Sequence, residues 1–445
     1  MKRIIIFIFY LLAFTLIKAQ TPISFIEVDT ATYNAYLKGD WNRIIKTGNF
    51  GIENNIDYYY LRLRIAYSFY MKEQYRSAIP HYKKALQFNE NDAIALEFLY
   101  RCYLYASQYN DAEKLVKNFS SPLKKQFNKK DSKILTGLSF YTSFGTGGNP
   151  DLKNEISNSL PSVSDGTQVF VNGFKNFNLN LSHRFKHSII AHHSLNLLFK
   201  ESYSAAIVDG FSYISESQEV RQISYGLVLD VTPVHSITVS PLFTYINYRI
   251  PIFYDYGLGT GKNREVFEYR KFQEYVLGVK GTKHFKLIQS SLAFTHSNLN
   301  NSKQNTVAGS LAYYPWSNLN LYYTGSAYWH LQNKNSNTLN QFIHSHKVGA
   351  KLLTNLWLEV YGILGEFTNF HDSFSSLTYN SLEQYKFLTG ANIIVPFFKH
   401  NLSLLLSYRY NQSKSIFVPK DKIFEYSNNK DFNYQSITGG LSWKI

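Results

Sequence analysis

The chain has 445 residues and a formal net charge of +15, a length beyond that of one ordinary soluble domain. Aromatic residues are abundant, with 36 Tyr and 34 Phe, while charged residues reach only 17% against a globular average of about 25%. The 24 Gly and 11 Pro exclude a collagen-like or a Pro/Gly-rich disordered chain. After residue 20 there is no apolar run of about 18 residues, which excludes a bundle of transmembrane helices.

Residues 1–19 have the pattern of a secretory signal peptide. A cationic start at Lys2 and Arg3 precedes an apolar run over residues 4–17 and the small residue Ala19. This order of charged, apolar and small residues predicts export and cleavage near Ala19. The alternative is an uncleaved anchor helix, which the shortness of the apolar run disfavours.

Residues 20–125 are predicted to form an α-helical domain built from repeats of 34 residues. One aromatic set and one small or apolar set recur at this spacing: Trp41, Tyr75 and Tyr109, and Ile44, Ala78 and Ala112. In stacked helix pairs a small residue lets two helices approach and an aromatic residue fills the gap beside it. The pattern resembles the tetratricopeptide repeat, which implies a concave surface for a periplasmic protein or polymer. The alternative is a plain helical spacer.

Two further features of this part are simpler. Residues 126–132 are polar and basic, and we predict that they form a linker. The only cysteine, Cys102, cannot form an intramolecular disulfide, so we interpret it as a small buried hydrophobe.

From residue 133 to residue 445 the apolar period changes to two, as in strands with one apolar and one polar face. Leu402, Leu404 and Leu406, for example, alternate with Ser403 and Ser407. The pattern predicts fourteen strands, near residues 133–145, 168–185, 188–203, 219–232, 235–249, 268–280, 284–297, 304–315, 318–331, 341–353, 356–368, 383–396, 400–411 and 432–445.

The connections between these strands alternate in length. Short turns such as residues 354–355 alternate with long loops such as 250–267, 369–382 and 412–431, which we expect to be external. Short turns at one end and long loops at the other are typical of a bacterial outer-membrane barrel with periplasmic termini. The predicted fold class is therefore α+β and multi-domain, with helical repeats followed by an antiparallel transmembrane β-barrel. The alternative, a soluble β-sandwich, would not produce this two-sided bias.

If the apolar faces point to lipid, a set of charged residues points into the lumen. This candidate set is Arg184, Lys200, Lys280, Lys347, Lys351, Lys386, Arg409, Asp230, Glu274 and Glu359. The excess of cations would favour anionic solutes or polymers. The alternative is that these charges pair with loops or plug the lumen.

The sequence carries no motif for covalent chemistry, and we expect no catalytic, cofactor or metal site. His344 and His346 share a face but lack a third ligand, and zinc sites use three or four. The basic residues are spread along the chain, which argues against a nucleic acid partner. A lipid-modifying barrel enzyme would require a His–Ser pair close in space at the barrel rim.

The order of signal peptide, helical repeats and barrel resembles two groups of proteins. One is the exporters of extracellular polysaccharides, and the other is the smaller YaiO-type barrels. The resemblance implies an outer-membrane channel that transports or exports polar or anionic cargo, with the repeats docking a periplasmic partner. The alternative function is a closed barrel that anchors the repeats as a scaffold for a secretion or envelope-assembly machine.

Overall fold

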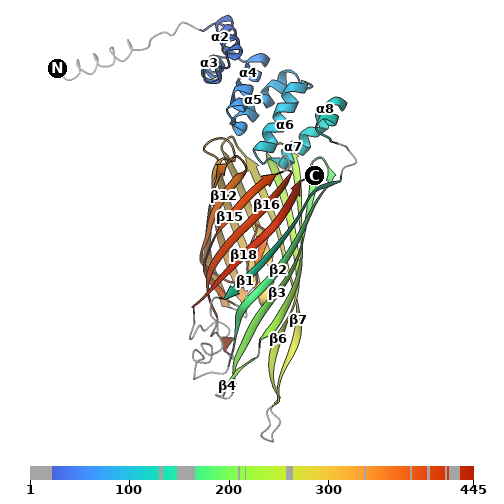
Figure 1. The fold of residues 1–445 in the computed structure, drawn as a ribbon, viewed down its shortest axis with the longest axis vertical. Helices are drawn as coiled ribbons and strands as arrows, with labels where there is room; N and C mark the ends of the chain where they lie inside the picture. Colours follow the sequence, from blue (N-terminus) through green and yellow to red (C-terminus); the bar gives the residue numbers. More distant parts are fainter. Residues whose placement is uncertain are drawn as a thin grey trace, which may run out of the picture. The chain divides into compact units, whose positions relative to one another are not determined.

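The structure is a computed structural model in which helices come first and strands follow (Figure 1). It describes residues 23–129, 134–147, 166–208, 211–215, 217–256, 264–334, 337–380, 383–397, 401–415, 418–419 and 431–444. The predicted signal peptide, residues 1–19, and residues 130–132 of the predicted linker lie outside these ranges. The chain divides into two compact units, Met1–Tyr103 and Leu104–Ile445, which are described in turn.

The first unit is helical and repeats regularly. It contains α2 (Phe25–Leu37), α3 (Trp41–Glu53), α4 (Tyr59–Met71), α5 (Tyr75–Phe88) and most of α6 (Ala93–Tyr105). Helices α2, α4 and α6 begin at residues 25, 59 and 93, so the predicted spacing of 34 holds for whole helices. Among the described residues, no helix is long and apolar enough to cross a membrane.

Five of the six residues predicted to pack the repeats are buried or partly buried, whereas the sixth, Tyr109, is exposed. Ile44 and Ala78 are completely buried, as is Ala112 in the helix that follows the first unit. Trp41 packs edge-on against Tyr36 and Tyr67, and Tyr75 packs edge-on against Tyr70. Cys102 is also buried, and burial raises the pKa of its thiol. These contacts are those of a packed helical core.

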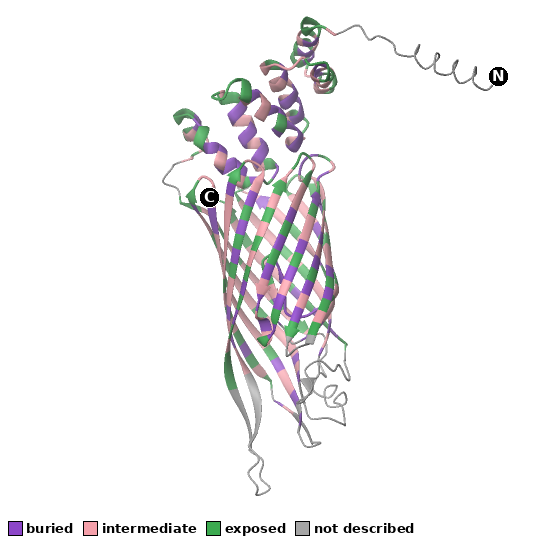
Figure 2. Cartoon of the chain, turned by 180° about the vertical axis from the view of Figure 1, so that it is seen from behind, coloured by how far each residue is buried: buried purple, intermediate pink, exposed green. Residues whose placement is uncertain are grey.

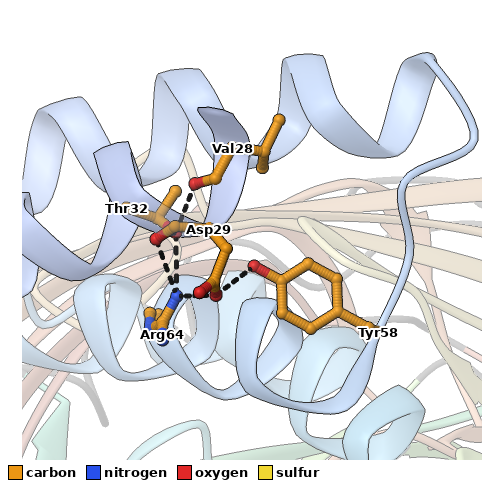
Figure 3. A network of polar contacts seen from close by, with 5 residues as sticks. All are labelled: Val28, Asp29, Thr32, Tyr58 and Arg64. Carbon is orange, nitrogen blue, oxygen red and sulfur yellow. Dashed lines mark hydrogen bonds and ion pairs between the residues drawn. The ribbon is translucent and has the colours of Figure 1, made fainter. Parts of the chain in front are cut away.

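A polar network joins α2 to α4 (Figure 3). The Asp29 carboxylate accepts hydrogen bonds from the Tyr58 hydroxyl and the Arg64 guanidinium, each at 2.7 Å. Arg64 also donates to the Thr32 hydroxyl at 3.0 Å, and Thr32 in turn donates to the carbonyl of Val28 at 2.8 Å. The hydrogen bond from Tyr58 lowers the pKa of Asp29, and burial raises the pKa of Tyr58 to about 12. The network therefore favours the ionised carboxylate.

The second unit begins with α7 (Tyr109–Leu115), the 3-10 turn η1 (Val116–Asn118) and α8 (Ser121–Gln126). The barrel strands follow. They are β1 (Leu135–Gly147), β2 (Gly166–Lys186), β3 (Ile189–Val208), β5 (Gln218–Val234), β6 (Ile237–Tyr256), β7 (Arg264–His284), β8 (Ile288–Ser297), β9 (Lys303–Tyr313), β10 (Leu321–Lys334), β11 (Asn337–Leu353), β12 (Leu356–Phe367), β15 (Gln384–Phe397), β16 (Leu402–Lys414) and β18 (Asp431–Lys444).

These fourteen strands close into an antiparallel barrel, which confirms the predicted fold class. Strand β1 pairs with β18 on one side and with β2 on the other, and β2 pairs with β3. Closure leaves no free edge in the wall. Four short strands lie outside the wall order: β4 (Phe211–Ile214), β13 (Phe370–Asp372), β14 (Leu377–Tyr379) and β17 (Val418–Pro419). The short turns and the end of β18 define the short-turn end of the barrel, and the opposite end is the long-loop end.

Burial alternates along the wall strands (Figure 2). On β10, Tyr328 and His330 are buried inside the barrel, whereas Trp329 between them is 56% exposed outside. The outward rows are apolar on every side of the barrel. Large exposed apolar side chains of these rows include Leu181, Leu195, Ile223, Phe243, Leu277, Leu292, Leu311, Phe342, Val360, Leu406 and Ile437.

Candidate functional site in the barrel lumen

The segment between β12 and β15 folds into the barrel. Residues 369–382 were predicted to form an external loop, and this prediction is wrong for the residues that the structure describes. Thr368, Phe370, His371 and Asp372 are buried, as is Tyr379, and β13 and β14 pair as a small hairpin. We call residues 368–380 the lumen loop. It bridges two wall strands that pair directly with each other.

One side of the lumen loop packs against an aromatic cradle, which we define as the wall residues Tyr328, His330, Phe367 and Tyr385. Phe370 of the loop packs edge-on against Tyr328 and His330, with ring centroids 5.0 and 5.8 Å away. Tyr379 of the loop stacks on Phe370 and packs edge-on against Phe367 and Tyr385. Aromatic pairs in these geometries add to the free energy gained by burial.

Aliphatic and alanine side chains complete this side of the lumen. They come from five wall strands and form one buried cluster with the aromatic rings: Ala293, Ala308, Ile343, Ile363 and Leu388. In these apolar surroundings one carboxylate of the loop contacts the cradle. The Tyr328 hydroxyl donates a hydrogen bond to the Asp372 carboxylate at 2.7 Å.

The other side of the lumen loop is held by hydrogen bonds. The Asn380 amide donates to Gln222 on β5 at 2.8 Å and reaches Glu274 on β7 at 3.4 Å. Asn300, in the short turn η2 (Leu299–Asn301), donates to Asn369 and to the carbonyl of Asn380. In the strand order β5 lies seven steps from β12 in either direction. The lumen loop therefore crosses the barrel from one wall to the opposite one.

Two buried carboxylates anchor this crossing. Glu274 accepts from the Tyr248 hydroxyl at 2.7 Å and from the backbone N–H of Asn300 at 2.5 Å. Glu383, which follows the lumen loop, accepts from the Tyr434 hydroxyl on β18 at 2.6 Å and from the N–H of Val171 on β2 at 3.2 Å. Glu274 was in the predicted lumen set, and Glu383 was not.

Several other predicted lumen charges have partners on the inward face. Arg184 pairs with Glu113 of α7 at 2.6 Å, and Lys347 approaches Glu359 at 3.4 Å. Glu359 also accepts from Tyr322 and Asn392. Asp230 accepts from Ser240 at 2.7 Å and from Asn110 at 2.8 Å. These contacts show that part of the inward charge is neutralised within the second unit.

Four predicted cations have weaker contacts. Arg409 lies 3.4 Å from the Tyr361 hydroxyl, and Lys351 lies over the Trp357 ring at 5.2 Å. Lys200 lies opposite buried Val220 and within electrostatic range of Glu274 and Glu383. Lys280 lies opposite buried Ala293, on the wall that carries the apolar cluster. The inward face thus retains cationic groups that are not in ion pairs within the described residues.

Lys386 is placed differently from the rest of the predicted set. It lies at a bulge between Tyr385 and Phe387 and pairs with Asp431. Asp431 is exposed, whereas the next residue, Phe432, is buried in the barrel. Because successive strand residues face opposite sides, this ion pair lies on the outer side of the wall.

Helix α7 is fastened to the short-turn end of the barrel, a feature that sequence reasoning missed. Asp111 accepts from the N–H of Ser236 in the β5–β6 turn at 2.7 Å, and Lys114 donates to the carbonyl of Thr232 at 3.0 Å. Glu113 pairs with Arg184 on β2, and Lys444 on β18 lies over the Tyr109 ring. The helix that carries two of the predicted repeat positions therefore belongs to the barrel unit.

A His–Ser pair also lies on the inward face near the short-turn end. The Ser182 hydroxyl is 2.8 Å from Nδ1 of His192, and Nε2 of His192 is 3.4 Å from Asp230. Acyl transfer additionally needs N–H donors aimed at the developing oxyanion. Ser182 lies in a central strand paired with both β1 and β3, so its neighbouring N–H groups are used in the ladders. The Ser182 hydroxyl and the His192 ring are close enough for proton transfer. The backbone of β2 beside Ser182, however, offers no N–H group for an oxyanion site.

The histidines predicted to share a face are close together. Nδ1 of His344 is 3.0 Å from Nε2 of His346, and the Tyr323 hydroxyl is 2.7 Å from the other nitrogen of His346. In the part of the chain that the structure describes, no group of three or more His, Cys, Asp or Glu side chains is arranged to hold a metal ion.

No known protein family matches this sequence, and no curated protein matches it. Solved structures show only a distant likeness. The chain is similar to a Pseudomonas aeruginosa FadL homologue with 8% identity and a TM-score of 0.40, over 69% of this chain and 90% of that one. It is similar to the Pseudomonas putida toluene transporter TodX with 6% identity and a TM-score of 0.41, over 71% and 90%. For a bacterial polysaccharide outer membrane secretin the values are 7% and 0.33, over 71% and 100%.

Proposed function

We propose that this chain is an outer-membrane channel for polar or anionic cargo, closed by the lumen loop in the conformation described above. The short-turn end faces the periplasm, and the helical unit is the periplasmic docking module. Acidic polysaccharide is one cargo class that this order of parts suggests. The barrel carries out no covalent step.

The outer surface of the barrel supports a membrane location. Large apolar side chains such as Leu292 and Phe342, 70% and 65% exposed, would face water in a soluble protein. A band of this kind is the lipid-facing surface of an outer-membrane barrel. The predicted signal peptide directs the chain to the same compartment. Short turns face the periplasm in such barrels, which gives the proposed orientation.

One observation carries the proposal of a channel. The lumen is crossed by a segment whose covalent connections to the wall lie only at its two ends, and β12 and β15 on either side of it pair directly. The segment can therefore leave the lumen without breaking a wall strand pair. A barrel closed permanently by inward side chains would not have this property. Cations such as Lys200 and Arg409 would then line the opened lumen and favour anions.

The regular helices support the docking role of the first unit. Helices α2, α4 and α6 begin at a constant spacing of 34 residues, and the repeat positions Ile44 and Ala78 are buried. Stacks of this kind present a continuous surface to a partner. We propose a tetratricopeptide-type module that holds a periplasmic protein or polymer near the barrel, as in YaiO-type barrels and polysaccharide exporters.

Single-channel recording in planar bilayers tests the channel. The full-length protein is compared with a variant in which residues 370–379 are replaced by a short Gly/Ser linker. We expect brief, rare openings in the parent and steady, anion-preferring conductance in the variant. Heat-modifiable migration on SDS gels verifies that both barrels are folded. If a folded variant shows no conductance, the proposed channel function is contradicted.

The second candidate function is a closed scaffold barrel that anchors the helical unit. The fastening of α7 by Glu113, Asp111 and Lys114 favours it, because a firmly held helix suits an anchor. A variant lacking residues 24–103 but retaining α7 separates the two functions. A scaffold would lose a co-purified periplasmic partner in this variant and would stay silent with or without the lumen loop.

A further inference from the structure

The chemistry of the lumen loop points to the chemistry of the cargo. We propose that the lumen loop occupies the binding site of the cargo, and that the cargo is an amphipathic organic anion with a flat apolar ring and a carboxylate. This inference rests on the proposed channel function and narrows its anionic cargo.

The loop places two rings and one carboxylate against the wall. Phe370 is completely buried, and it stacks with Tyr379 at 6.1 Å between centroids and 15° between ring planes. Asp372, two residues after Phe370, accepts the hydrogen bond of the Tyr328 hydroxyl. Two stacked rings beside a carboxylate are the pattern of a ring-bearing acid.

The wall that receives these groups has matching chemistry. The rings of Tyr328, Phe367 and Tyr385 form the sides, and Ile343, Ile363 and Leu388 form an aliphatic floor. Ligand sites of this composition are mostly apolar, with a few polar groups that fix the orientation. The Tyr328 hydroxyl is one such group, because it loses its partner Asp372 when the loop leaves and can then bind a polar group of the cargo.

One cationic side chain, that of Arg409, lies at the edge of the same site. Arg409 lies beside the Tyr361 hydroxyl, and Tyr361 packs against the apolar cluster. A guanidinium binds a carboxylate through a charge-assisted, often bidentate hydrogen bond. Arg409 is therefore the residue that would select an acid over a neutral ring compound.

An acidic polysaccharide fits this site less well. Its rings carry hydroxyl groups around their edges, and the aliphatic floor of Ile343, Ile363 and Leu388 offers no hydrogen-bond partner to them. Buried hydroxyl groups without partners cost free energy. The site favours a ring that is apolar over most of its surface.

The test uses 1-naphthoate as the probe in single-channel recording on the full chain with the 370–379 replacement. We expect transient blockades by 1-naphthoate and none by 2-naphthol or gluconate at the same concentration. Arg409→Gln should shorten the blockades about tenfold, the loss of one charge-assisted hydrogen bond. Lys351→Gln, which removes an inward cation away from the cradle, should leave them unchanged.

The outcomes separate the inference from the proposed function. Blockade by trigalacturonate but not by 1-naphthoate would overturn the inference while the channel stands. Equal effects of Arg409→Gln and Lys351→Gln would also overturn it, because binding would then reflect general charge. If the folded variant carries no current, the channel fails, and calorimetric titration of the same proteins with 1-naphthoate decides the inference. A second test uses Asp372→Asn in the intact loop. This variant should bind 1-naphthoate more tightly than the unchanged protein, because its loop would be held less firmly in the site.

Discussion

The two sides of the lumen loop are held by different kinds of interaction. Toward β8–β12 and β15 it packs two rings into a buried apolar cluster, where the ring contacts are non-directional and survive small movements. The Tyr328–Asp372 hydrogen bond is a polar contact on this mainly apolar side. Toward β5, β7 and the η2 turn it is held by hydrogen bonds of Asn380 and Asn369 with Gln222, Glu274 and Asn300, which are lost as soon as the distance grows.

From this difference we infer which side of the loop would detach from the wall first in the proposed channel. Each hydrogen bond contributes on the order of 1 kcal/mol net, because water replaces the lost partner once the site is wet. Burial of a Phe side chain contributes several kcal/mol. We therefore expect the polar side to detach with the loop still packed on the cradle, which would leave a partly open lumen.

The largest expected effect comes from weakening the apolar side. Phe370→Ala removes a completely buried ring and should destabilise the packed loop by about 3–5 kcal/mol. The loop would then lose its most deeply buried ring and keep the packing of Tyr379 and its hydrogen bonds, so the open fraction in single-channel recording should rise steeply. Phe374→Ala, at a half-buried ring of the same loop, is the control and should have a smaller effect. Equal effects of the two changes would show that the Phe370 ring is not the main attachment.

The second prediction concerns the buried ion pair that fastens α7. Glu113→Gln removes the carboxylate that pairs with the buried guanidinium of Arg184 and should loosen α7 by about 3 kcal/mol. The measurement is hydrogen exchange of α7 peptides in the intact protein. Glu97→Gln removes the anion of an intrahelical pair with Arg101 near the surface and should change exchange in α6 only slightly. No acceleration in α7 would mean that its other contacts carry the attachment.

The third prediction addresses the polar side of the lumen loop. Asn380→Ala removes the hydrogen bonds to Gln222 and Glu274 and should raise the open fraction by about fivefold, corresponding to about 1 kcal/mol. Asn178→Ala removes an inward amide that bonds Ser194 in the wall and does not touch the loop. Recording both variants beside Phe370→Ala ranks the two sides directly, and a larger effect of Asn380→Ala would reverse the proposed order of opening.

The wall of the barrel could be predicted from the sequence because it depends on a local period. Residues such as Leu402, Leu404 and Leu406 reveal a strand whatever their partners are, and alternating turn lengths reveal the pairing order. Fourteen strands follow from these two signals, and so does the inward direction of residues such as Glu274. A period of 34 likewise marks the helices.

The lumen loop and the α7 attachment depend on contacts far apart in sequence, which no local period encodes. Asn380 meets Gln222, 158 residues earlier, and Glu113 meets Arg184, 71 residues later. A weak signal for the loop was present, since residues 368–380 contain three aromatic rings where an external loop is mostly polar. The bulge at Lys386 also had no sequence signal, and a one-residue bulge reverses the face of a side chain.

The smallest expected effect extends the comparison to the helical unit, where α2 is joined to α4 by the polar contacts of Asp29. The Tyr58 hydrogen bond lowers the pKa of Asp29 in the folded protein. Its contribution to stability is therefore complete above the unfolded pKa of about 3.9 and is lost as pH falls through the lower folded value. Hydrogen exchange of α2 peptides should accelerate between about pH 4 and pH 3, after correction for intrinsic rates.

Substitution of the donor separates this contact from general acid effects. Tyr58→Phe removes the hydroxyl that bonds Asp29 and should make α2 exchange faster at pH 5, with a smaller further change on acidification. Tyr60→Phe changes an exposed tyrosine of the same helix and should preserve the pH dependence of the parent. The buried apolar contacts of α2, such as Val28, do not titrate, so they set the protection that persists at pH 3. If α2 loses all protection there, polar contacts dominate this helix, and the order expected for the lumen loop does not hold in the helical unit.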